Sequence, residues 1–132
     1  MQNPPVGDLW RFLPRGYLLT VLIESPFLWL LLPKLKLSQR FWLGLWLTAC
    51  TYPIVVLVMP TAMDGVSRGV YLLVAETFAP LAECCLFWLS IRGQNEFTRK
   101  DWLISFATIT LANLASFAIG EMLWLSGLHL NA

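Results

Sequence analysis

Histidine is nearly absent from this chain, whose single copy, His129, stands close to the end. One such histidine excludes a His-based catalytic triad and an HExxH zinc site. The sequence also lacks a glycine-rich loop of the kind that holds phosphates. We therefore expect no enzymatic activity, no metal site and no cofactor.

Charged side chains are scarce as well, at 13% of the residues, and the net charge is +1. The nine basic residues lie in short flanks and loops without a basic, aromatic-rich patch, which excludes nucleic-acid binding. Cys50, Cys84 and Cys85 lie in apolar segments, whereas a zinc ribbon or disulfide framework needs spaced pairs in loops. These cysteines are expected to serve in packing.

Apolar side chains, in contrast, make up 58% of the chain, more than a soluble domain carries. They form four runs near or at spanning length, in residues 16–32, 41–59, 69–91 and 102–125. The sequence predicts an all-α polytopic membrane protein, with one four-transmembrane-helix bundle in residues 16–128. Residues 1–15 are expected to form an N-terminal tail, either interfacial or disordered, and residues 129–132 a short C-terminal tail.

The loops differ in their basic residues, and this difference predicts the orientation. Six basic residues occupy the first and third loops: Lys34, Lys36, Arg40, Arg92, Arg99 and Lys100. Only three lie on the opposite side: Arg11, Arg15 and Arg68. Because basic loops stay in the cytoplasm, both termini are expected outside, in a bacterial cytoplasmic membrane.

Four of the eight acidic residues lie within the apolar runs, and no lysine or arginine lies in those runs with them. A carboxylate near the bilayer centre costs about 2.5 to 3.5 kcal/mol on insertion scales, so such groups usually face a bundle interior. Glu24 and Glu83 fall near the middle of their runs, as does Asn113. Glu76 and Glu121 are shallower and are expected to form an outer acidic mouth.

Three prolines interrupt the runs, at Pro26, Pro53 and Pro80. Each lacks the N–H that would bond to the carbonyl four residues earlier, so we expect helix kinks there. Free carbonyls at this depth accept from a protonated carboxyl group or ligate a cation, and they persist only where protein or a wet cavity surrounds them. These positions therefore also indicate an interior face.

Small residues recur at four-residue spacing in the last run and predict its main helix-packing seam. They are Thr108, Ala112, Ser116 and Gly120. Asn113 lies beside this seam. Its amide is expected either to join helices through simple hydrogen bonds or to donate to Glu24 or Glu83.

A weak duplication relates the two halves of the chain. Glu24, a basic-aromatic turn at 40–43 and a polar segment at 48–53 are matched by Glu83, 100–103 and 113–117. Two parallel helical hairpins related by an axis along the membrane normal would bring the two glutamates to equivalent central positions. The match is also compatible with chance.

Two functional hypotheses follow. The first is an accessory or assembly subunit, whose buried carboxylates contact a larger intramembrane protein partner. The alternative is a proton- or cation-coupled transporter or channel protomer with a central site at Glu24, Glu83 and Asn113. Four helices enclose little space, so such a protomer is expected to form a homo-oligomer. Both hypotheses place the chain in a lipid bilayer.

Overall fold

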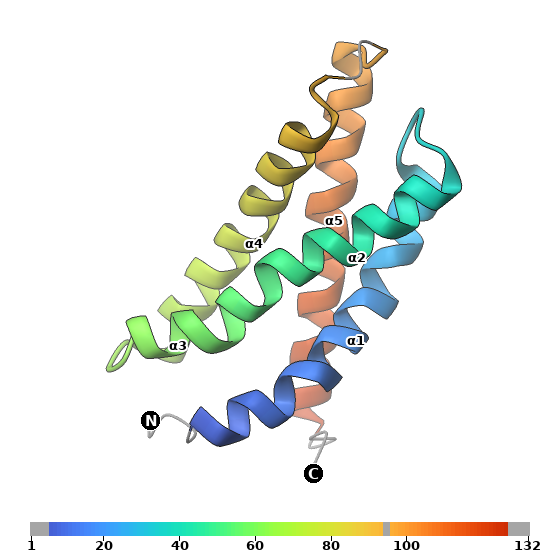
Figure 1. Cartoon of the computed structure of the whole chain (residues 1–132). Helices are drawn as coiled ribbons and strands as arrows, with labels where there is room; N and C mark the ends of the chain where they lie inside the picture. The colour runs from blue at the N-terminus through green and yellow to red at the C-terminus, as the bar shows by residue number, and fades with distance from the viewer. Residues whose placement is uncertain (1–5, 94–95, 127–132) are drawn as a thin grey trace.

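The computed structural model describes residues 6–93 and 96–126, and within these ranges every regular element is helical. The long helices alternate in direction along the chain (Figure 1). Their bounds are α1 Val6–Leu31, α2 Leu37–Pro53, α4 Arg68–Ile91 and α5 Arg99–Leu125. A π-helix, η1 (Ile54–Val58), and a short α3 (Met59–Ala62) extend α2 without a break. The prediction of an all-helical chain is confirmed for the described residues.

Three of the described helices are long and apolar enough to cross a membrane: Leu37–Ala62, Arg68–Ile91 and Arg99–Leu125. They contain the second, third and fourth predicted spans. The first predicted span lies within α1, which begins earlier, at Val6. Residues 6–15, predicted as a tail, are the first turns of this helix, which accommodates Pro14 in its interior. The predicted tail at 129–132 lies outside the described residues.

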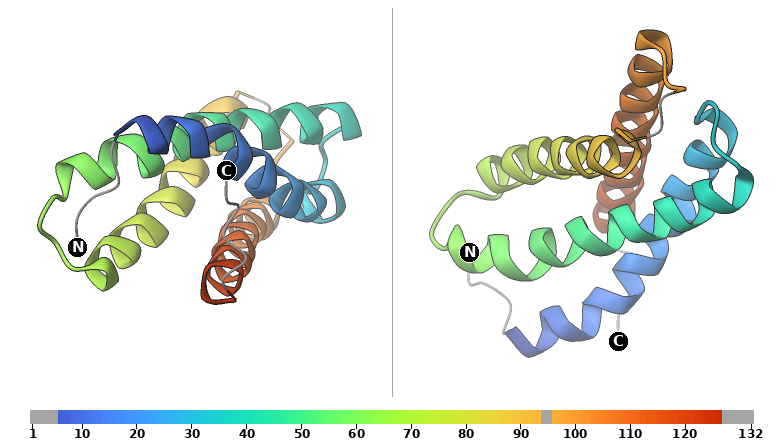
Figure 2. Two further views of the ribbon diagram at one scale, coloured as in Figure 1. Left: turned by 90° about the horizontal axis from the view of Figure 1, so that it is seen from below. Right: turned by 45° about the horizontal axis from the view of Figure 1, so that its top comes forward.

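The helices surround a common centre rather than lying in one layer, as the turned views show (Figure 2). Each long helix contacts two main neighbours, α1 packing on α2 and α5, and α4 packing on the same two. The start of α1, the turn at 63–67 and the end of α5 lie at the lower end in Figure 1. The loop at 32–36 lies at the upper end, and so do residues 92–93 and 96–98. We use lower and upper in this sense throughout.

Polar contacts fix the upper loops to each other. Thr98 and Asp101 form a reciprocal cap at the start of α5, because each backbone N–H donates to the other's side chain, at 2.8 and 3.3 Å. The Lys34 ammonium group lies 3.1 Å from Asp101 Oδ2 and donates to the Glu96 carbonyl at 2.5 Å. Lys34 itself has a positive φ of 58°. The first loop is thereby tied to the third.

The hydrophobic core fills the upper half of the bundle. Its buried members are Leu28, Leu32, Leu35, Leu43, Leu47, Phe87, Ile91 and Ile109. Phe87 is fully buried and makes edge-to-face contacts with three aromatic rings, at centroid distances of 5.8 to 6.5 Å. Those rings belong to Phe97, Trp102 and Phe106. Packed side chains therefore fill the interior at this end, and a groove that Leu35, Leu43 and Ile91 help to line opens beside them.

The outer faces of the helices carry large apolar side chains, whereas several polar groups are inside. Leu73 on α4 and Leu103 on α5 are 68% and 62% exposed, but Glu24 and Glu83 are each only 3% exposed. Exposed apolar surface of this extent is unfavourable in water and suits contact with lipid. The distribution agrees with the three membrane-spanning candidates.

Candidate functional site

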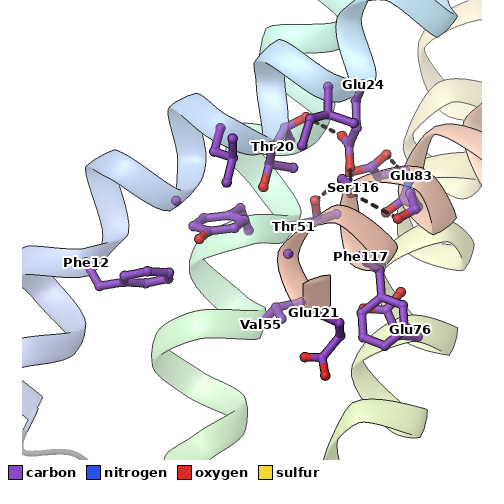
Figure 3. A pocket seen from close by; sticks show the side chains of 18 residues that line it. Phe12, Thr20, Glu24, Thr51, Val55, Glu76, Glu83, Ser116, Phe117 and Glu121 are labelled. Carbon is purple, nitrogen blue, oxygen red and sulfur yellow. Dashed lines mark hydrogen bonds between the residues drawn. The ribbon is translucent and has the colours of Figure 1, made fainter. Parts of the chain in front are cut away.

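A cavity of about 200 Å³ lies among the four helical segments, between the middle of the bundle and its lower end (Figure 3). All four predicted intramembrane acids line it, and so does Asn113. Glu24 and Glu83 lie close together at its deep end, and Glu76 and Glu121 lie nearer the lower end. The structure therefore places Glu24 and Glu83 deeper in the cavity than Glu76 and Glu121.

Glu24, on α1, accepts hydrogen bonds from two neighbouring helices. The Thr48 hydroxyl on α2 donates to Glu24 Oε2 at 3.0 Å. The Ser116 hydroxyl on α5 donates to Glu24 Oε1 at 2.7 Å. Both oxygens of this buried carboxyl group are therefore satisfied within the chain.

Glu83, on α4, is bound in a matching way. The Thr51 hydroxyl on α2 donates to Glu83 Oε1 at 2.7 Å. The Asn113 amide on α5 donates to Glu83 Oε2 at 2.8 Å and to the Ile109 carbonyl at 3.0 Å. Asn113 was expected to reach Glu24 or Glu83, and in the structure its amide donates to Glu83.

The hydrogen bonds of the two glutamates follow the same pattern. Each accepts one bond from the other helix of its own hairpin and one from the opposite hairpin. The donors on α2 are three residues apart, and so are the donors on α5, Asn113 and Ser116. The same spacing of three residues thus separates the two donors on each helix, at positions 48 and 51 and at positions 113 and 116.

Each hydroxyl in this cluster also lies within hydrogen-bonding distance of a backbone carbonyl of its own helix. Thr48 Oγ1 is 3.1 Å from the Gly44 carbonyl, and Thr51 Oγ1 is 3.1 Å from the Leu47 carbonyl. Ser116 Oγ is 2.9 Å from the Asn113 carbonyl. A hydroxyl has one proton, so each can donate either to a carboxylate or to its own helix.

The lower part of the cavity corrects one feature of the sequence analysis. Glu121 is not without a basic partner, because Arg68 Nη2 reaches its two carboxylate oxygens at 2.7 and 2.8 Å. Arg68 begins α4, just outside the predicted third span, and its partner is 53 residues away in the sequence. A count of charges within the apolar runs cannot detect a partner that reaches in from a flank.

The helices continue through Pro26 and Pro80, whereas a π-helix follows Pro53. A proline lacks the N–H and displaces the carbonyl four residues earlier, and the wider π turn is one way in which a helix accommodates this disturbance. Within η1, the Val55 carbonyl accepts a hydrogen bond from the Tyr71 hydroxyl at 2.9 Å. The π-helix thus borders the cavity and is tied to α4.

The predicted small-residue seam of α5 is only partly a packing surface. Thr108 and Ala112 are buried, but Ser116 serves the carboxylate cluster. Gly120 is exposed on the cavity wall, and a Cβ there would meet no atom within 4 Å, so close packing does not require this glycine. Close packing does require Gly16, whose added Cβ would lie 1.8 Å from the Tyr52 hydroxyl oxygen.

The sequence analysis did not assign Thr48, Thr51 or Ser116 to the site. Threonine and serine are common in helices and usually bond to their own backbone, so their type alone carried no signal. Their spacing relative to the glutamates in the duplicated hairpins was the available signal. Position 48 corresponds to 113, and position 51 to 116.

Within the described ranges, no group of three or more histidine, cysteine or acidic side chains is arranged to hold a metal ion. Comparisons with protein-family models, with curated proteins and with solved structures found no match to this chain. The chemistry of the site therefore rests on its own geometry.

Proposed function

We propose that this protein is a small proton-binding membrane transporter or channel protomer, in which Glu24 and Glu83 take up protons through the cavity. Asn113 and the hydroxyls of Thr48, Thr51 and Ser116 hold these carboxyl groups. Glu76 and Glu121 form the outer part of the route. The bound and transported species in this proposal is the proton.

One observation carries the proposal. Each hydroxyl has two acceptors within hydrogen-bonding distance, a glutamate oxygen and a backbone carbonyl of its own helix. When a glutamate is charged, the hydroxyl donates to it, and the distances of 2.7 to 3.0 Å between hydroxyl and carboxylate oxygens are those of hydrogen bonds. When the glutamate is protonated, its own O–H donates to the hydroxyl oxygen, and the hydroxyl turns to its backbone carbonyl at 2.9 to 3.1 Å. Both protonation states are therefore satisfied without moving a helix.

The same geometry favours a proton over a metal ion. Each oxygen of Glu24 and Glu83 faces a hydrogen-bond donor, whereas a metal site presents several oxygen lone pairs to one point. A donor such as the Asn113 amide repels a cation and attracts a carboxylate. The cluster therefore suits a proton that attaches to one carboxyl oxygen.

The shape of the bundle gives the route a direction. The cavity extends toward the lower end, and the packed core around Phe87 closes the upper end. In the proposed arrangement α1 also crosses the membrane, as the first of four spans. The basic upper loops lie in the cytoplasm, and the lower end faces outside a bacterial cytoplasmic membrane. Protons then enter from outside, and passage inward requires the upper core to open.

The role of accessory or assembly subunit is less favoured by the site. In that role the buried carboxylates would contact a membrane partner across a helix face. Glu24 and Glu83 instead accept hydrogen bonds from α2 and α5 of the same chain. An intramembrane partner or a second copy would have to bind through the apolar outer faces.

Proton flux into proteoliposomes tests the proposal. Purified protein is reconstituted with a pH-sensitive dye inside the vesicles, and a potassium diffusion potential drives protons inward. We expect flux above the protein-free background in the wild type, and a return to that background in Glu24→Gln and in Glu83→Gln. Glutamine keeps the shape of the side chain but cannot exchange the proton.

Glu96→Gln is the matched control, because Glu96 is exposed in the loop at the upper end, away from the cavity. Its flux should equal that of the wild type. Each variant is first checked for an unchanged size-exclusion profile and thermal unfolding. Wild-type vesicles without flux, or glutamine variants with undiminished flux, would refute the proposed function.

A further inference from the structure

Arg68 occupies an unusual position at the lower end of the cavity. Its guanidinium group binds both oxygens of Glu121, which is itself a lining residue, and lies over the Trp124 ring at 4.0 Å from the centroid. The pair joins the first residue of α4 to the last turns of α5. Glu76, the other acid in the lower part of the cavity, forms no salt bridge within residues 6–93 and 96–126.

The contact is arranged so that it can be broken and remade. The Arg68 and Glu121 side chains are 31% and 25% exposed, so water can replace either partner. Ion pairs with this degree of exposure contribute little to stability. The Trp124 ring offers the guanidinium a second, cation–π contact that does not depend on the carboxylate.

We propose that Arg68 is a displaceable gate at the mouth of the cavity and sets its charge preference, an inference that rests on the proposed function. In the structure Arg68 occupies Glu121 and neutralises it. An entering cation competes with the guanidinium for this carboxylate. Arg68 stays over the Trp124 ring while the cation is bound to Glu121. Without Arg68, the mouth carries an uncompensated negative charge and attracts cations more strongly.

Thiol labelling measures this preference without any need for proton transport. Ala79 lines the cavity between Glu76 and Glu83 on α4, so a cysteine there reports access beyond the mouth. Gly120 offers a second position, because an added side chain has open space. Each cysteine is introduced after removal of the three native ones, which do not line the cavity: Cys50, Cys84 and Cys85.

The measured quantity is the ratio of reaction rates with a cationic trimethylammonium-ethyl and an anionic sulfonatoethyl methanethiosulfonate. Arg68→Gln should raise the cationic rate and lower the anionic rate, each by about threefold, since this corresponds to a partly exposed charge. Glu121→Gln leaves the arginine uncompensated and should shift the ratio in the opposite direction. Arg68→Lys retains the charge and should keep a ratio near the wild-type value.

Arg92→Gln is the matched control. Arg92 also stacks on a tryptophan, Trp88, at 5.2 Å from the ring centroid, but it lies at the upper end of α4, away from the cavity. An unchanged ratio in the Arg68→Gln variant, or an equal shift in Arg92→Gln, would overturn the gate. So would a failure of both cysteines to react with either reagent, because the mouth would then be closed to solution.

The outcome is separate from that of the proton-flux experiment. A shifted ratio in a protein that carries no protons would retain the gate and reject the proposed function. An unchanged ratio in a protein that carries protons would reject the gate and retain the proposed function.

Discussion

Replacing Phe87 by alanine is expected to lower the free energy of unfolding by about 2 to 3 kcal/mol, at or below the lower end of the range for Phe→Ala in soluble cores. Phe87 is fully buried and contacts three aromatic rings at the upper end of the bundle. The loss comes mainly from the cavity and the missing dispersion contacts. The transfer term is small, because the unfolded helices remain in an apolar solvent.

Titration with sodium dodecyl sulfate in mixed micelles, followed by circular dichroism, measures this change. Phe41→Ala is the control, since Phe41 is 40% exposed and should lose much less stability. A loss below about 1 kcal/mol for Phe87→Ala would show that the upper end is not a tightly packed core.

Thr51→Val should cost about 1 to 2 kcal/mol of unfolding free energy, because it removes a hydroxyl but keeps the shape of the side chain. Glu83 Oε1 would lose its 2.7 Å donor while remaining buried. An unsatisfied carboxylate oxygen is more costly than an unsatisfied neutral group. Water in the cavity would recover part of the loss, which sets the lower limit.

Thr77→Val provides the comparison for this substitution. Thr77 lies on the exposed face of α4, and its hydroxyl bonds only to the Leu73 carbonyl of its own helix, at 2.7 Å. We expect a change within about 0.5 kcal/mol. Equal effects of the two substitutions in the same unfolding titration would mean that the bond from Thr51 to Glu83 does not stabilise the fold.

Much of the helical pattern was predictable, because runs of apolar residues of spanning length have few alternatives to helix. The start of α1 at Val6 was not, since residues 6–15 mix charged and apolar side chains and include Pro14. The π-helix after Pro53 was also missed. A proline signals a disturbed helix, but the neighbouring contacts decide whether the backbone bends, widens or continues.

The candidate site was predictable in its acids and less so in their partners. Depth along a helix follows from sequence position, so the central placement of Glu24 and Glu83 could be computed. The pairing of each helix with its neighbours could not, and therefore Ser116 was assigned to packing and Arg68 to a loop. Both reach their partners across the bundle, from 92 and 53 residues away.

Infrared difference spectroscopy of the carboxyl groups tests the central claim most directly, because it detects protonation itself. Protein in lipid nanodiscs is taken through a pH titration, and the C=O stretching band of protonated carboxylic acids is followed. We predict a pH-dependent band in the wild type and in Glu96→Gln, and a clearly smaller band in the double variant Glu24→Gln, Glu83→Gln, in which six acidic side chains still contribute. A folded double variant that retains the full band would contradict proton exchange at these two residues.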